Sequence, residues 1–186
     1  MEFTVLKTRE KISPLFFAVL TAFLLADRGG IAAPVICFSL LHELCHFAVL
    51  GALKKAPREI NISAAGISMR LCGMSTTERV LVFAAGAAGN FAAAVLCFAV
   101  GRGLFCGVNL AIGIFTMLPL CSTDGGSIFA ALAEKFFPER AKQLCKAVFT
   151  ACGAITAAAL FAAAAVYENP YLLIGAFYAV ICLIKY

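Results

Sequence analysis

Residues 31–53 read IAAPVICFSLLHELCHFAVLGAL, and this stretch decides the class of protein. It is long enough to form a membrane-spanning helix, which needs roughly 20 apolar residues. It nevertheless contains His42, Glu43 and His46. A charged side chain in lipid costs about 3 kcal/mol on insertion scales, so ionisable groups at this depth usually have a function.

The spacing of these three residues indicates metal chemistry. His42 and His46 are four residues apart and therefore share one face of a helix. Two imidazoles so placed can bind a zinc ion, while the carboxylate of Glu43 acts on a water molecule beside the metal. The alternative is a pair of core histidines that hydrogen-bond to neighbouring helices. The zinc interpretation is favoured, because three polar side chains at this spacing carry a large free-energy cost in lipid if they serve only packing.

The composition of the whole chain supports a membrane location. The chain has 186 residues, of which 63% are apolar and 13% charged, against roughly 45–50% and 25% in soluble domains. A soluble domain of this size has no means of burying so much apolar surface. Disorder and nucleic-acid binding are excluded on the same grounds, since the net charge of +5 is spread between apolar runs. We predict an all-α polytopic membrane protein without a signal peptide. Its nine cysteines have no CxxC spacing and are expected to be free, reduced thiols.

The order of apolar and polar segments predicts about six transmembrane helices in a single domain of residues 1–186. The apolar runs are 14–26, 31–53, 80–100, 104–120, 147–166 and 171–184. Between the second and third runs, apolar residues alternate with small or polar ones over residues 60–71, which predicts a small β-hairpin. Residues 127–146 read as an interfacial amphipathic helix with a break at Pro138. The core of the domain is expected at about residues 10–130, followed by C-terminal helices over 147–186.

The distribution of lysine and arginine predicts the orientation. With six spans and a cytoplasmic N-terminus, 13 of the 15 basic residues lie in cytoplasmic segments, and only Arg28 and Arg102 lie outside. This bias is the positive-inside pattern. The first apolar run is short for a span. If it is only interfacial, the N-terminus and its three basic residues move to the other side.

A catalytic zinc site usually has three protein ligands and one open position. The chain has no third histidine, so the third ligand must be a carboxylate or a thiolate. Asp124 is the candidate, because it follows Pro119 at the end of an apolar run, on the cytoplasmic side that the histidine helix also reaches. Gly125 and Gly126 allow a tight, irregular backbone after the acid. The alternative role for Asp124 is an ordinary turn residue or helix N-cap.

Together these motifs resemble the site-2 protease family of intramembrane zinc metalloproteases, most closely its branch of stage IV sporulation protein FB. The family motif HExxH is matched in full. A second family motif, Asn-x-x-Pro-x-x-Pro-Leu-Asp-Gly-Gly, is matched at Pro119, Asp124, Gly125 and Gly126, whereas Thr116, Ser122 and Thr123 replace Asn, Pro and Leu. The family stretch Ala-Gly-Pro-x-x-Asn corresponds to residues 85–90, with Ala87 in place of Pro, and an upstream family Asn matches Asn109.

The resemblance implies a zinc metalloendopeptidase with one Zn²⁺ per chain. His42, His46 and Asp124 would bind the metal, and Glu43 would be the general base. Asn90, Asn109 and Thr116 are candidates for binding substrate or the oxyanion. For each of them the alternative role, a hydrogen bond between helices, is favoured at least as much. The edge of the hairpin is a candidate for holding an extended substrate. The alternative, equally favoured, is a hairpin that only covers the catalytic helix.

The resemblance also implies a setting. The substrate would be a membrane-anchored regulatory protein, such as a pro-sigma or anti-sigma factor, cut at the cytoplasmic side of a bacterial cytoplasmic membrane. Neither a PDZ nor a CBS domain is expected, so regulation would come from a membrane partner or from substrate access. Two alternatives remain: a metal carrier or sensor with the same ligands, and a catalytically inactive scaffold, for which the replacements at Thr116 and Ser122 are the evidence.

Overall fold

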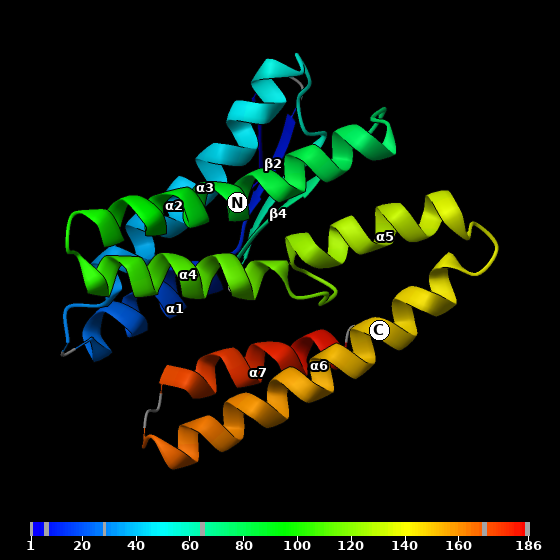
Figure 1. Cartoon of the computed structure of the whole chain (residues 1–186). Helices are drawn as coiled ribbons and strands as arrows, with labels where there is room; N and C mark the ends of the chain where they lie inside the picture. The colour runs from blue at the N-terminus through cyan, green and yellow to red at the C-terminus, as the bar shows by residue number, and fades with distance from the viewer. Residues whose placement is uncertain (1, 6–7, 28, 64–65, 169–170, 185–186) are drawn as a thin grey trace. The chain divides into compact units, whose positions relative to one another are not determined.

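Each of the six apolar runs forms a helix in the computed structural model, which describes all residues except 1, 6–7, 28, 64–65, 169–170 and 185–186. The described residues divide into two units, Met1–Thr116 and Met117–Tyr186, and each is described here by itself. Figure 1 shows the elements. In chain order they are β1 (Glu2–Val5), β2 (Thr8–Ile12), α1 (Pro14–Ala26), α2 (Ala32–Ala52), β3 (Glu59–Ser63), β4 (Gly66–Arg70), α3 (Thr76–Ala99), α4 (Gly103–Met117), α5 (Asp124–Phe136), α6 (Ala141–Val166) and α7 (Tyr171–Ile184).

Three of the helices, α2, α3 and α6, are long and apolar enough to cross a membrane. The apolar helices α4 and α7 are shorter, and α1 has 13 residues. At 1.5 Å per residue α1 is about 20 Å long, less than the roughly 30 Å of a bilayer's hydrocarbon core. Large apolar side chains of α3, such as Val95, Leu96 and Phe98, are exposed. Such outward apolar side chains suit contact with lipid, so the prediction of a helical polytopic membrane fold is confirmed.

The hairpin predicted over residues 60–71 is also confirmed, because β3 and β4 pair antiparallel between residues 59 and 70. It belongs to a larger sheet in the order β1-β2-β3-β4. Strands β1 and β2 were not predicted from the sequence, and they form an antiparallel hairpin of their own. Strand β2 then pairs parallel with β3. The N-terminus therefore extends the sheet on the side of β3 away from β4.

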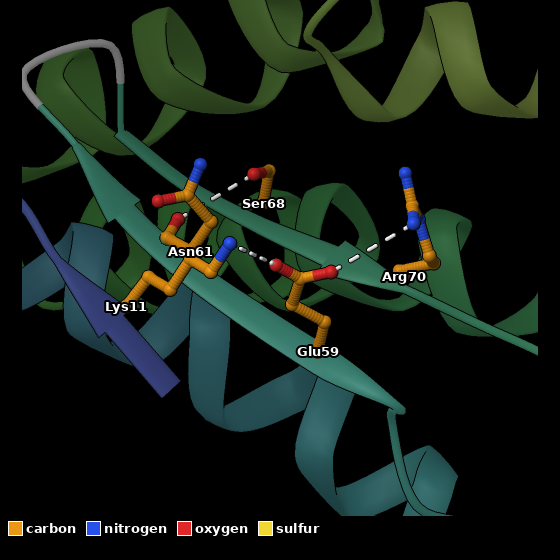
Figure 2. Close-up of polar contacts among 5 residues, drawn as sticks. All are labelled: Lys11, Glu59, Asn61, Ser68 and Arg70. Atoms are coloured by element: carbon orange, nitrogen blue, oxygen red, sulfur yellow. Dashed lines mark hydrogen bonds and ion pairs between the residues drawn. The ribbon is translucent and has the colours of Figure 1, made fainter. Parts of the chain in front are cut away.

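The sheet has a polar face, which Figure 2 shows. The carboxylate of Glu59 lies 3.3 Å from the Lys11 ammonium and 3.8 Å from the Arg70 guanidinium, which joins three strands. The neighbouring pair is Asn61 opposite Ser68. Because side chains alternate along a strand, the isoleucines and methionine of β3 and β4 lie on the other face.

The second unit consists of α5, α6 and α7. Helix α6 packs against both α5 and α7, and it lies beside α7 in Figure 1. The break predicted at Pro138 is present, since α5 ends at Phe136 and α6 begins at Ala141. The prediction of a separate amphipathic helix up to residue 146 is wrong in its second half. Lys142 and Lys146 belong to the first turns of α6, whose buried Cys145 and Phe149 pack with Ala133 of α5.

The start of α2 is held by a carboxylate from the preceding turn. Asp27 accepts hydrogen bonds from the backbone N–H groups of Ala32 at 2.9 Å and of Gly29 and Ile31 at 3.2 Å each. These bonds, that of Ala32 above all, lower the pKa of Asp27 from its ordinary value of 3.8. A charged acceptor at the N-terminus of a helix also complements its dipole.

We predict that Asp27→Asn lowers the stability of the protein near neutral pH, because the uncharged amide is a weaker acceptor. A group with a lowered folded-state pKa stabilises above its unfolded pKa of about 4, and this contribution is lost as pH falls through the folded value. Thermal unfolding in detergent should therefore show a gap between wild type and variant at pH 6 that shrinks below pH 4. A gap that stays constant down to pH 3 would contradict this account.

Candidate metal centre

The two histidines of α2 are both buried, with 4% of His42 and 1% of His46 exposed. Their ring centroids lie 4.7 Å apart with the ring planes nearly perpendicular. Helix α2 packs against α3, and Phe83 of α3 meets the ring of His46 edge-on at 6.4 Å between centroids. The i, i+4 spacing thus places two imidazoles side by side at the interface of α2 and α3.

The Nδ1 atom of each imidazole is engaged by α3. His46 Nδ1 lies 2.6 Å from the backbone carbonyl oxygen of Val82. His42 Nδ1 lies 2.7 Å from the side-chain Oδ1 of Asn90. Since both partner oxygens accept hydrogen bonds, each Nδ1 carries the proton and donates. The Nε2 atom of each ring then keeps its lone pair, which is the state that a metal ligand requires.

The two Nε2 atoms lie against Gly86 of α3. A Cβ atom placed on Gly86 would lie 2.5 Å from Nε2 of His42 and 2.5 Å from Nε2 of His46. Both nitrogens therefore approach one point beside the α3 backbone, where a side chain has no room. Zinc binds imidazole nitrogen at about 2.0–2.1 Å. Two Nε2 atoms that keep their lone pairs and lie beside the same stretch of α3 backbone are near enough to each other to bind one metal ion.

Glu43 lies next to His42 on α2, and its side chain is half-buried. One of its carboxylate oxygens, Oε2, is enclosed by the protein. A carboxylate that is withdrawn from solvent beside a candidate metal ligand has the position that a general base would need.

Asp124 belongs to the second unit, where it is the first residue of α5. The backbone after it is helical, so the predicted irregular backbone at Gly125 and Gly126 is wrong. The two glycines instead allow a close contact between the first turn of α5 and the loop before it. A Cβ on Gly125 would meet the carbonyl of Met117, and one on Gly126 would meet the carbonyl of Leu120. They let the loop of residues 118–123 fold back tightly onto the first turn of α5.

Thr123 holds that loop, and the sequence analysis did not recognise its role. It is the N-cap of α5 in place of Asp124, and its hydroxyl accepts from the Gly126 N–H at 3.3 Å. The same hydroxyl donates to the carbonyl oxygen of Leu118. The available signal was a threonine directly before the first turn of a helix, which is a preferred N-cap. The cap fixes the backbone from which the Asp124 carboxylate projects.

The remaining candidate residues make hydrogen bonds inside the first unit. Asn90 and Asn109 are both fully buried, and the Asn90 amide donates to Oδ1 of Asn109 at 3.0 Å. The Thr116 hydroxyl donates within its own helix, to the carbonyl oxygen of Ile112 at 3.0 Å. The expectation that these three residues bind substrate or an oxyanion stays a prediction.

Comparisons with known proteins identify the fold. No protein-family model matches the sequence, and no curated protein matches it. A solved structure of a site-2 protease from Methanocaldococcus jannaschii is similar, with a TM-score of 0.70 over 100% of this chain and 94% of that chain, at 15% sequence identity. The chain thus has the fold of a site-2 protease. The resemblance to the sporulation branch stays a prediction.

We predict that Gly86→Ala abolishes metal binding at the histidine pair. The added methyl group would occupy the point that both Nε2 atoms approach, so zinc affinity should fall by at least about 100-fold, the upper range for changes outside the ligands themselves. Zinc affinity of the purified protein can be measured by competition with a chromophoric chelator. The matched control is Gly107→Ala on α4, where a Cβ meets nothing within 4 Å. Equal affinities in the two variants would contradict the role of Gly86.

Proposed function

We propose that this protein is an intramembrane zinc metalloendopeptidase that hydrolyses a peptide bond in or near a transmembrane segment of a membrane-anchored protein. The observation that carries the proposal is a pair of buried imidazoles next to the carboxylate of Glu43. Their Nδ1 atoms are hydrogen-bonded to α3, and their Nε2 atoms lie beside Gly86. The fold of a site-2 protease supports it. One Zn²⁺ per chain is the proposed cofactor.

His42, His46 and Asp124 are the proposed ligands. Each offers one ligand atom, an imidazole nitrogen or a carboxylate oxygen. Two imidazoles, one carboxylate and an open position are a donor set typical of catalytic zinc. In such a site zinc supplies Lewis acidity, which polarises a carbonyl group and lowers the pKa of water to about 7. Asp124 is chosen because it lies in the stretch that resembles the second family motif and ends Asp124-Gly125-Gly126. Thr123 and the two glycines hold the backbone of this stretch in place.

Glu43 is the proposed general base. Its carboxylate takes a proton from the attacking water and then gives it to the leaving amine, as the two steps of peptide hydrolysis require. A metal carrier would need ligands but no proton-transfer group beside them, and an inactive scaffold would need neither. Glu43 therefore favours hydrolysis over both alternatives.

The proposed substrate is a membrane-anchored regulatory protein that reaches the site from the bilayer. Lysine and arginine lie mainly in segments that six spans place in the cytoplasm, which supports cleavage toward the cytoplasmic side of a bacterial membrane. The peptide must be extended to be cut. Strand β4 stands at the end of the sheet order, so its outer edge is a candidate for pairing with an extended segment. A membrane partner is a candidate regulator.

We predict that the detergent-purified protein contains about one zinc per chain, and that His46→Ala and Asp124→Ala both lose it, because two remaining ligands bind zinc weakly. Elemental analysis after dialysis measures the metal content. Cys72→Ser is the matched control, since Cys72 is an exposed thiol and is not among the proposed ligands. Absence of zinc from the wild type, even after zinc is supplied, would contradict the proposal and favour the scaffold.

We predict that Glu43→Gln keeps its zinc and loses peptidase activity by about 10²–10⁴-fold, the usual contribution of a general base. The glutamine has nearly the same size but accepts no proton at neutral pH. Cleavage of a panel of fluorogenic single-span peptides in reconstituted vesicles measures the activity. A variant that binds zinc and cleaves as fast as wild type would contradict the role of Glu43. Zinc binding without cleavage of any peptide by the wild type would favour the metal carrier.

A further inference from the structure

A chain of side-chain hydrogen bonds runs from α4 through α3 to His42 on α2. The Asn109 amide donates to the carbonyl oxygen of Phe105 at 2.9 Å, one turn back in its own helix. Its Oδ1 accepts from the amide of Asn90 at 3.0 Å. The Oδ1 of Asn90 lies 2.7 Å from His42 Nδ1. Both asparagines have 0% exposure, so they are closed to solvent and have no free surface to offer a substrate.

The direction of this chain is fixed by two backbone carbonyls, because a carbonyl oxygen can only accept. The Phe105 carbonyl requires the NH₂ group of Asn109 to face it, which turns Oδ1 of Asn109 toward Asn90. The amide of Asn90 also donates to the Phe38 carbonyl at 3.2 Å. Both N–H groups of Asn90 are then used, and only its oxygen remains for the imidazole. If the oxygen and the NH₂ group of Asn90 exchanged places, the oxygen would face two other acceptors, the Phe38 carbonyl and Oδ1 of Asn109.

We propose that Asn90 and Asn109 are positioning residues, which together hold the His42 imidazole in the tautomer that carries its proton on Nδ1. Asn109 acts only through Asn90, whose orientation it fixes. This role rests on the proposed function, in which the Nε2 lone pair of His42 binds the metal. It assigns to both asparagines a role other than substrate or oxyanion binding.

The two histidines differ in this respect. His46 Nδ1 bonds directly to a backbone carbonyl, that of Val82, which no side-chain substitution removes. The tautomer of His42 depends instead on two side chains from two other helices. Loss of the asparagines should therefore change His42 and leave His46 as it is. His46 is a reference within the same molecule.

The test is nitrogen NMR of the full chain in detergent, labelled with ¹⁵N in histidine and stripped of metal with a chelator. The chain has only His42 and His46, so the spectrum holds four ring nitrogens, and His46→Ala assigns them. The spectra are recorded at pH 8.5, about two units above the ordinary pKa of an imidazole. In the wild type both histidines should show a protonated Nδ1 and an unprotonated Nε2. In Asn90→Ala the His42 signals should shift toward a mixture that includes the Nε2–H tautomer, while those of His46 stay unchanged.

A double-mutant cycle on zinc affinity gives the second readout. Asn90→Ala should weaken zinc binding by about 10–100-fold, the usual effect of losing a partner of a metal-ligating histidine. Asn109→Ala should weaken it less, and it should add nothing in the Asn90→Ala background, because it acts through Asn90. Thr116→Val is the matched control. It removes the Thr116 hydroxyl from the same helix. Within the described part of the chain this hydroxyl bonds to the carbonyls of Ile112 and Gly113, so the change should leave zinc affinity unchanged.

The outcomes separate this inference from the proposed function. A wild-type His42 with its proton on Nε2, or asparagine variants with unchanged His42 signals, would overturn the inference even if zinc binds. Fully additive losses of zinc affinity would overturn the action of Asn109 through Asn90. If the expected tautomers are found but the wild type takes up no zinc, the positioning role stands and the proposed function fails. Should Asn90→Ala not fold, Asn109→Ala compared with Thr116→Val makes the same distinction.

Discussion

The close approach of α3 to α2 at Gly86 is the constraint on which the rest of the metal centre depends. A side chain at Gly86 would fill the point that both Nε2 atoms face, and a Cβ on Gly89 would collide with the thiol of Cys45. With glycine at both positions the α3 backbone comes near enough for Val82 and Asn90 to reach the two imidazoles. The same contact therefore brings both imidazoles against the α3 backbone and fixes their orientation.

Polar groups at this depth have to be satisfied within the protein, because lipid offers no hydrogen bonds. The structure meets this demand with backbone carbonyls of Phe38, Val82 and Phe105, which all accept. A carbonyl has one possible role, so it sets the direction of every hydrogen bond attached to it. Both rings donate from Nδ1, and both Nε2 atoms lie beside Gly86. The buried imidazoles and asparagines between these helices are thereby all hydrogen-bonded, and their hydrogen bonds have fixed directions.

Much of this arrangement could be predicted from the sequence, and the limits have physical causes. The apolar runs gave the helices, the alternation over residues 60–71 gave the hairpin, and the spacing of His42 and His46 gave a shared helix face. Strands β1 and β2 could not be predicted. Strand β2 is polar in sequence, and it depends on a parallel partner about 50 residues away. The contact of Gly86 with the two histidines could not be predicted either, because it depends on which face of α3 packs against α2. Thr123 was treated as a departure from a motif, whereas it is the cap that forms the Asp124 turn.

The most direct test of the central claim is zinc K-edge absorption spectroscopy of the purified, zinc-loaded protein. The chain has two histidines and nine cysteines, so the scattering pattern separates the possible ligand sets clearly. The account predicts a single zinc environment with two imidazoles bound at about 2.0–2.1 Å, light oxygen atoms in the remaining positions and no sulfur. A shell of sulfur atoms at about 2.3 Å, or fewer than two imidazoles, would contradict it.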